Sequence, residues 1–183
     1  MNLIKNKKIL IFLITMIFLY FFLSYFVAFS AFRIGNDTYE STPENFNLSY
    51  EEIDILTSQS SISTWWIPND SDKTIIMLHG LRSQKADMKI LSKIDEFSNL
   101  GYSIIAIDFR NHGKSGEGDF TFGVDEVNDV FSTIKYYRDN KNLKIFGIWG
   151  FSYGATTALL TGLEFDKKDF DVEIVGIFAE SPY

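Results

Sequence analysis

The sequence predicts an α/β domain with a mostly parallel, doubly wound sheet, preceded by one transmembrane helix. A run of 24 residues without a charge, 9–32, is typical of a membrane-spanning helix. After residue 50, short apolar runs suited to buried strands alternate with segments whose apolar residues recur at helical spacing. Strands that are separated by helices indicate a parallel sheet with right-handed crossovers.

The N-terminal region divides into a basic stub, 1–8, and the apolar segment, 9–32. A helix of that length rises roughly 36 Å, enough to cross a hydrocarbon core of about 30 Å. A cleaved signal peptide is the alternative, with Ala28-Phe29-Ser30 as a small-residue cleavage site, but its apolar stretch is usually about 7–15 residues long. Length therefore favours an uncleaved anchor. Lysines before the segment and only Arg33 just after it predict a single-pass protein of the cell membrane with a cytoplasmic N-terminus and an extracytoplasmic domain.

The charge and the cysteine count exclude several classes of function. The stub holds three of the 17 basic residues, so the 151 residues after the apolar segment carry 14 basic and 24 acidic residues, a net charge of −10. This balance argues against nucleic acid as a partner and against binding to anionic lipid. The absence of cysteine excludes disulfides, thiolate metal sites and a cysteine nucleophile.

The elements of the domain, 50–183, follow a linker at 33–49. The segment 50–57 places two isoleucines at period two and is predicted to be an outer strand, and 64–67 holds paired tryptophans before a Pro-Asn-Asp turn. Helical spacing predicts helices over 87–100, ended by Gly101, from Val124 to Ile134, and over 153–163. Asp125 and Glu126 fall in the first turn of the second of these helices, where its dipole favours acids. Buried strands are predicted at 74–78, 102–109, 143–149 and 172–179.

The third buried strand runs directly into Gly150-Phe151-Ser152-Tyr153-Gly154, which matches G-x-S-x-G between a strand and a helix. In that context the serine occupies a sharp turn that exposes its hydroxyl, and the glycines leave room for the turn. Ser152 is therefore predicted to be a nucleophile, with the backbone N–H of Tyr153 as one oxyanion donor. The alternative is a glycine-rich turn with an incidental serine.

The loop after the first buried strand, His79-Gly80-Leu81-Arg82, is expected to supply the second oxyanion donor. The backbone N–H of Leu81 is preferred, and that of Arg82 is next. His79 precedes the serine, whereas in proteins with a G-x-S-x-G turn between a strand and a helix the base follows the serine. We therefore expect the His79 ring to brace the loop by hydrogen bonds.

The loop after the second buried strand reads Asp108-Phe109-Arg110-Asn111-His112-Gly113-Lys114-Ser115. Asp108 and Arg110 are expected to form charge-assisted bonds that fix this loop. We expect a structural role for His112, because the chain order of such a triad is Ser…Asp/Glu…His and His112 precedes Ser152. A role as general base is the alternative.

Together, His79-Gly80, the loop 108–115 and the segment 150–154 resemble the α/β-hydrolase superfamily, and more narrowly membrane-anchored bacterial serine hydrolases of the esterase, lipase and serine-aminopeptidase-like branch. The final segment, 179–183, also resembles the end of the next strand in that branch, so the likeness spans about 50–183. The resemblance implies acyl transfer from a small-molecule ester or amide to water through an acyl-serine intermediate. We expect no metal and no cofactor, because the acids of 116–123 lack a ligand pattern.

The resemblance also implies an acid after the next strand and a histidine after the last, yet no histidine follows His112. Glu180 is a poor replacement, because a serine hydroxyl needs a base within hydrogen-bond reach. We therefore expect a C-terminally truncated chain (a gene fragment, a frameshift product or a partial sequence) that is poorly soluble and almost inactive alone, with 172–179 as an exposed apolar edge strand. The alternatives are a non-catalytic, membrane-anchored binding module and a transferase that uses the same acyl-serine.

Overall fold

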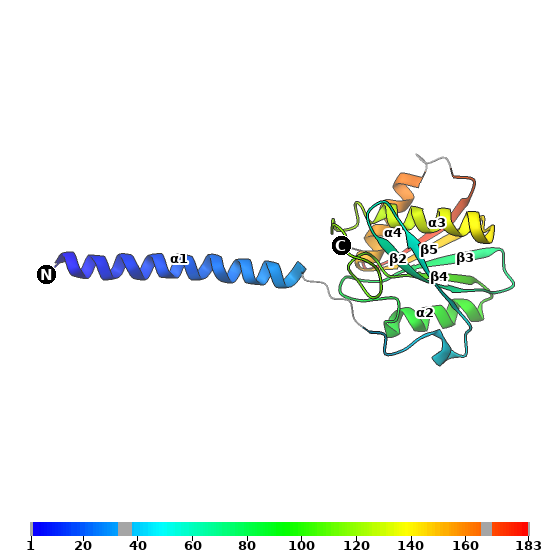
Figure 1. Cartoon of the computed structure of the whole chain (residues 1–183), viewed down its shortest axis with the longest axis horizontal. Helices are drawn as coiled ribbons and strands as arrows, with labels where there is room; N and C mark the ends of the chain where they lie inside the picture. Colours follow the sequence, from blue (N-terminus) through cyan, green and yellow to red (C-terminus); the bar gives the residue numbers. More distant parts are fainter. Residues whose placement is uncertain (1, 33–37, 166–169, 183) are drawn as a thin grey trace. The chain divides into compact units, whose positions relative to one another are not determined.

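The computed structural model describes residues 2–32, 38–165 and 170–182, which form two compact units, 1–34 and 35–183. The first five residues of the expected linker, Arg33 among them, and Tyr183 lie outside the described residues. The first unit is a single helix, α1 (Asn2–Phe32), whose segment Asn6–Ser30 has a mean hydropathy of 2.5 and is not buried by protein (Figure 1). This helix is long and apolar enough to cross a membrane, a criterion that a signal sequence near the N-terminus also meets.

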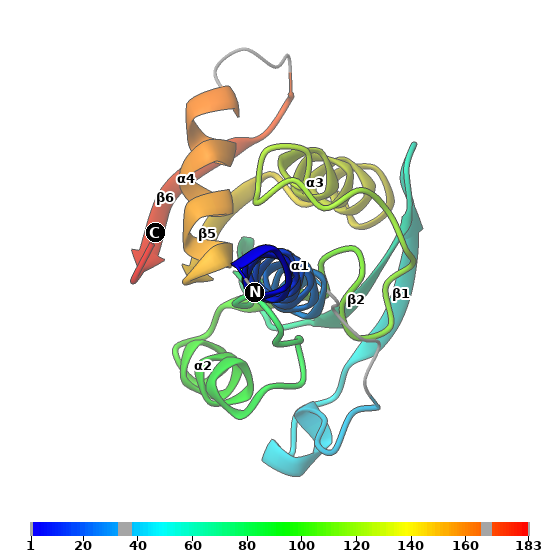
Figure 2. The same ribbon diagram turned by 90° about the vertical axis from the view of Figure 1, so that its left-hand side faces the viewer.

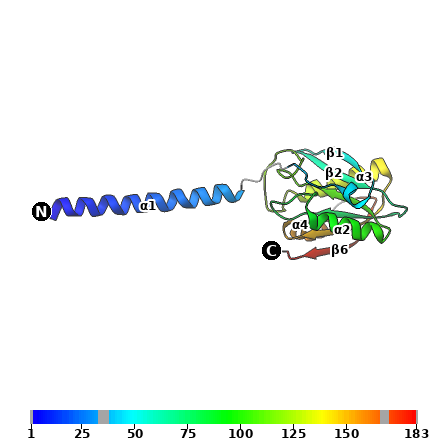
Figure 3. The ribbon, with the colours of Figure 1, turned by 90° about the horizontal axis from the view of Figure 1, so that it is seen from below.

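The second unit is an α/β domain with a mixed, mostly parallel sheet of six strands in its described part. The spatial order is β1-β2-β4-β3-β5-β6, in which β1–β2 and β2–β4 are antiparallel and the other pairs are parallel. The strands are β1 (Glu51–Leu56), β2 (Ser61–Ile67), β3 (Lys73–Leu78), β4 (Ser103–Ile107), β5 (Ile145–Phe151) and β6 (Glu173–Glu180). Figure 3 shows β1 and β6 at opposite margins of the domain. The α/β class and the outer position of the first strand are thus confirmed.

Helices cover both faces of this sheet, as Figure 2 shows for α2 on one side and α3 on the other. The helices are α2 (Met88–Asn99), α3 (Val127–Lys141) and α4 (Tyr153–Phe165), and a short 3₁₀ helix, η1 (Pro43–Phe46), precedes β1. One core layer contains the apolar faces of α3 and α4, and the other contains that of α2. Trp65 packs in the α2 layer and Trp66 in the opposite layer, because successive strand residues point to opposite faces.

Two expectations about element boundaries differ from the structure. The α3 helix begins at Val127, so Val124 lies outside it and is 65% exposed. Glu126 is the N-cap residue rather than a first-turn residue, and its carboxylate accepts hydrogen bonds from the backbone N–H groups of Thr121 (3.0 Å) and Gly123 (2.8 Å). These bonds hold the preceding loop in place of another helical turn.

The segment before β1 belongs to the domain. Tyr39, Phe46 and Leu48 pack against the α2 layer of the core. Part of the expected linker, 38–49, is therefore a lead-in that is fixed to the core of the domain.

Candidate active site

Ser152 lies in the turn between β5 and α4 with a left-handed backbone, φ 52°. Its carbonyl oxygen accepts hydrogen bonds from the N–H groups of Ala155 (2.9 Å) and Thr156 (3.1 Å), so Ser152 directly precedes the first residue of α4, Tyr153, and accepts its first hydrogen bonds. The left-handed conformation is uncommon and strained for a residue with a side chain. The hydroxyl-bearing side chain is half-buried rather than enclosed. This is the geometry of a strained, strand-to-helix turn that presents a serine.

Two glycines make this turn possible. A Cβ atom on Gly150 would lie 2.2 Å from the carbonyl oxygen of Gly154, and a Cβ atom on Gly154 would lie 2.3 Å from the carbonyl oxygen of Leu78. Both contacts involve backbone, which cannot swing away. The start of α4 therefore sits tightly against the end of β3, and only glycine fits at either position.

The loop after β3 approaches Ser152 directly. A Cβ atom on Gly80 would lie 3.6 Å from the Cβ atom of Ser152. On the other side, the N–H of Ser152 donates to the carbonyl oxygen of Glu180 at the end of β6, at 2.8 Å. The serine thus lies at the carboxyl edge of the parallel strands, between β3 and β6, where open α/β sheets bind ligands.

Of the two backbone amides considered as the second oxyanion donor, one is engaged. The N–H of Arg82 donates to Nε2 of His112 at 3.3 Å. The N–H of Leu81 has no backbone acceptor within the described part of the chain. The structure therefore leaves Leu81 as the better candidate beside the N–H of Tyr153. The Tyr153 side chain is itself buried, with ring centroids 4.8 Å from Phe109.

Both histidines are buried, and both nitrogens of each ring form hydrogen bonds with backbone groups. Nδ1 of His79 bonds the carbonyl oxygen of Gly80 at 2.7 Å, and its Nε2 accepts from the N–H of Phe109 at 3.0 Å. His112 repeats the pattern, with Nδ1 bonding the carbonyl oxygen of Arg110 at 2.9 Å while its Nε2 accepts from Arg82. The bonding assigns the neutral Nδ1–H tautomer to each ring. Burial lowers the pKa of His79 to about 4 and also lowers the pKa of His112. Each ring therefore joins neighbouring loop segments, and its acceptor nitrogen is already occupied by a backbone N–H.

Asp108 is the centre of a buried polar cluster that sequence reasoning found only in part. One of its carboxylate oxygens accepts from the N–H of Lys85 (2.7 Å), and the other accepts from the N–H of Lys114 (3.0 Å) and from the Tyr39 hydroxyl. The Lys85 side chain is fully buried, with Nζ 2.7 Å from Oγ of Ser63 and 3.3 Å from Asp108. Burial raises the pKa of Asp108, but the charge of Lys85 and the hydrogen bond from the Lys85 backbone lower it overall.

This cluster joins three segments at the carboxyl ends of the parallel strands, the end of the sheet that also carries Ser152. These segments are the lead-in, the loop after β3 and the loop after β4. Lys85 and Tyr39 were missed because an isolated lysine and a tyrosine in a polar segment carry no pattern. The nearest available signal was the expected charge-assisted bonding of Asp108, which calls for a cationic partner.

Arg110 fixes the second half of its loop, as expected, but its partner is on a helix. Its guanidinium makes a bidentate pair with Asp129 of α3, with both N–O distances at 2.8 Å, and the pair is buried. Nη1 also donates to Oε1 of Gln59. The loop after β4 is thereby attached to α3 and to the β1–β2 hairpin.

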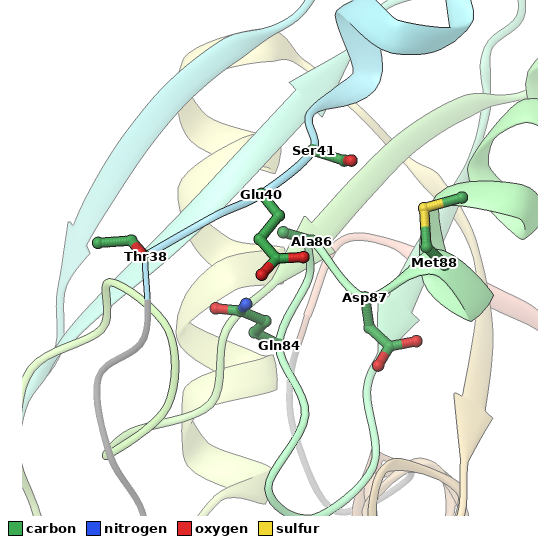
Figure 4. A pocket seen from close by; sticks show the side chains of 7 residues that line it. All are labelled: Thr38, Glu40, Ser41, Gln84, Ala86, Asp87 and Met88. Carbon is green, nitrogen blue, oxygen red and sulfur yellow. The ribbon is translucent and has the colours of Figure 1, made fainter.

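A polar pocket of about 460 Å³ lies where the lead-in crosses the loop after β3 (Figure 4). In Figure 4 the side chains of Glu40 and Gln84 extend into the space between these two segments. Its lining consists of Thr38, Glu40, Ser41, Gln84, Ala86, Asp87 and Met88. In the described residues, no group of three or more His, Asp or Glu side chains is arranged to hold a metal ion.

Comparison with known proteins agrees with the α/β fold. The profile of a family described as alpha/beta hydrolase fold matches residues 73–169. The uncharacterized protein YqkD of Bacillus subtilis (strain 168) is 35% identical over 96 residues, which are 51% of this chain and 30% of YqkD. The esterase Pf2001 of Pyrococcus furiosus superposes with a TM-score of 0.72 and 36% identity, covering 80% of this chain and 56% of that one.

A more distant structure shows the fold alone. Est1E of Butyrivibrio proteoclasticus, solved with ferulic acid bound, has a TM-score of 0.61 and 18% identity, covering 71% of this chain and 52% of Est1E. The chain thus spans about half the length of these two solved structures and under a third of YqkD.

Proposed function

Because the chain belongs to the α/β-hydrolase fold family, we propose that it carries the nucleophile part of a membrane-anchored serine hydrolase acting on acyl esters or amides. The observation that supports this most is the strained Ser152 turn, packed between two obligatory glycines and facing the loop of Leu81. The similarity to an esterase at 36% identity favours esters among the possible substrates.

In the proposed reaction, Ser152 Oγ attacks the acyl carbon and loses its proton to a base, while the alcohol or amine of the substrate leaves with a proton. Water then attacks the acyl-serine, which releases the acid and restores the hydroxyl. The N–H groups of Tyr153 and Leu81 stabilise the tetrahedral oxyanion in both steps, and each such donor typically contributes about 3 kcal/mol to lowering the barrier.

The base in this scheme is a histidine other than His79 and His112. Both of those rings have their acceptor nitrogen engaged by a backbone N–H. The 183 residues contain no third histidine, so we propose that the acid and the histidine of the triad belong to polypeptide outside this sequence. The alternative remains a non-catalytic module with the same fold.

A fluorophosphonate probe tests the proposal, because it bonds covalently to an activated serine. We expect weak labelling of the chain alone, strong labelling of an extended form that restores a later acid and histidine, and loss of both signals in Ser152→Ala. Ser181→Ala is the matched control, since Ser181 also has a left-handed backbone but lies exposed beyond β6. Absence of labelling in the extended form would favour the non-catalytic module, and rapid hydrolysis of a p-nitrophenyl ester by the 183 residues alone would show that the base is already present.

A further inference from the structure

Lys89 lies at a position where the helix itself disfavours a cation. It is the second residue of α2, and its N–H donates to the N-cap carboxylate of Asp87 at 2.8 Å. The positive end of the helix dipole lies there, so an ammonium group is not stabilised by the helix. The Lys89 side chain instead extends to Glu180, the last residue of β6, with Nζ 2.5 Å from Oε1. A residue that breaks a local preference is expected to have its role in another contact.

Lys89 also contacts the residue that precedes Ser152. Its Nζ lies 3.4 Å from the centre of the Phe151 ring, an arrangement in which the face of the ring attracts the cation. Phe151 and Glu180 are themselves paired across β5 and β6. One ammonium group therefore joins the ends of two neighbouring strands to the start of α2.

Both of these partners are in direct contact with the surroundings of the serine. The carbonyl oxygen of Glu180 accepts the N–H of Ser152 at 2.8 Å, so the residue that pairs with Lys89 also fixes the serine backbone. On the other side, Cδ1 of Phe151 lies 3.2 Å from the position of a Cβ atom on Gly80, in the loop after β3. A shift of the Phe151 ring or of the end of β6 would thus change the position of Ser152 relative to that loop.

We propose that Lys89 and Glu180 are positioning residues for Ser152. The ion pair holds the end of β6 and the Phe151 ring, and through them it sets the position of the serine relative to the N–H of Leu81. This inference rests on the proposed function for its chemistry. It also gives the Glu180 carboxylate a role other than that of a base, because one of its oxygens is bonded to an ammonium group. The two side chains are 37% and 33% exposed, so the pair adds little to global stability and acts on local geometry.

Two conservative substitutions remove the ion pair. Lys89→Met keeps the apolar stem over the neighbouring ring, and Glu180→Gln keeps the size of the side chain and the backbone carbonyl. Lys93→Met is the matched control, because Lys93 lies one turn further along α2 and pairs with Glu96 (2.6 Å) within the same helix. The double substitution Lys89→Glu with Glu180→Lys rebuilds the pair with its charges exchanged.

Hydrogen exchange of the Ser152 amide, followed by NMR of the full chain in detergent micelles, measures the positioning without catalysis. An exposed ion pair and a cation–ring contact each change an equilibrium constant by a few-fold, so we expect exchange about fivefold faster in Lys89→Met and in Glu180→Gln. Exchange should be unchanged in Lys93→Met and should return to the natural rate in the exchanged pair. Unchanged exchange in the single variants, no recovery in the exchanged pair, or equal acceleration at the Ile148 amide within β5 would overturn the proposal.

The consequence for the chemistry is measured with the extended form, as the rate at which a fluorophosphonate labels Ser152. We expect this rate to fall in Lys89→Met and in Glu180→Gln by the factor by which exchange rises, to stay the same in Lys93→Met, and to recover in the exchanged pair. Faster exchange with unchanged labelling would overturn a role in positioning the nucleophile. No labelling of the natural extended form would refute the serine chemistry itself, while the exchange result still decides whether the ion pair holds the turn.

Discussion

At the scale of single residues, the position of Ser152 depends on the absence of a side chain at the neighbouring glycines, Gly150 and Gly154. Gly154 lies against the carbonyl oxygens of Leu78 (2.3 Å from its virtual Cβ) and His79 (2.6 Å). Any side chain there pushes the first turn of α4 away from β3, and the turn that holds the serine moves with it. The position of Ser152 therefore depends on the close packing of α4 against β3.

The substitution Gly154→Ala tests this dependence. We expect it to lower the free energy of unfolding by about 3 kcal/mol, because overpacking against backbone cannot be relieved by a rotamer change. Urea unfolding followed by circular dichroism measures the loss. Gly176→Ala is the control, since a Cβ atom there has no neighbour within 4 Å and should change stability by less than about 1 kcal/mol. Equal effects at the two positions would contradict the tight contact.

His79 predicts a dependence of stability on pH. Its pKa falls from about 6.5 when unfolded to about 4 in the buried site. Between these values the unfolded chain binds a proton that the folded chain does not, so stability decreases as the pH falls from about 6.5 towards 4. Urea unfolding at pH 7 and pH 5 should show the decrease, and His79→Gln, which retains a donor and an acceptor, should show a smaller one. An unchanged slope in this variant would mean that His79 is not the titrating group.

At this scale the sequence predicts the local conformation of some site residues, but not the long-range contacts of others. The spacing of Gly150, Ser152 and Gly154 predicts the turn because a strained bend needs those residue types at fixed offsets. The bonds to Tyr39 and Lys85 could not be predicted, because they join segments that are distant in sequence and follow no periodic pattern. The bracing bonds of the histidines were predicted from chain order, but their partners, backbone N–H groups of neighbouring loops, required the fold.

At the scale of elements, apolar runs predicted the buried strands to within a few residues and the starts of α2 and α4 to within one residue, whereas the start of α3 was predicted three residues too early. Val124 fits the spacing of the α3 face, yet the Glu126 carboxylate engages the backbone of 121–123 and begins the helix later. Side-chain capping competes locally with helix, and hydrophobic spacing does not report it.

The β6 strand is a sheet edge whose outer side has no partner strand in the described part of the chain. Phe178, 61% exposed, lines an apolar groove of about 250 Å³ beside Trp149, whereas Ile177 points towards Gly162 of α4. Unpaired strand edges with apolar side chains promote aggregation. We expect Phe178→Lys to reduce light scattering of the detergent-solubilised chain while its circular dichroism is unchanged, and Ile177→Lys to unfold the domain. Undiminished scattering in Phe178→Lys would place the aggregating surface elsewhere.

At the scale of the whole molecule, the two units have opposite chemical character. The helical unit exposes a charge-free, mostly apolar surface over 9–30, while the domain carries a net charge of −10 and buries apolar residues in two layers around the sheet. Two fates are typical of such an N-terminal helix: it inserts into a bilayer as an anchor, or it is cleaved off as a signal sequence. The two differ in the mass of the mature protein.

The pair of substitutions Leu19→Arg and Phe22→Arg distinguishes insertion from peripheral association. Each charge at the centre of a spanning helix costs about 3 kcal/mol on insertion scales, so the double variant should leave the membrane fraction on alkaline extraction. Leu19→Ile with Phe22→Leu keeps the apolar character and should be retained like the natural chain. For the natural chain we expect a mass that includes the lysines of the stub. A mature protein that begins after residue 30 would identify the helix as a signal.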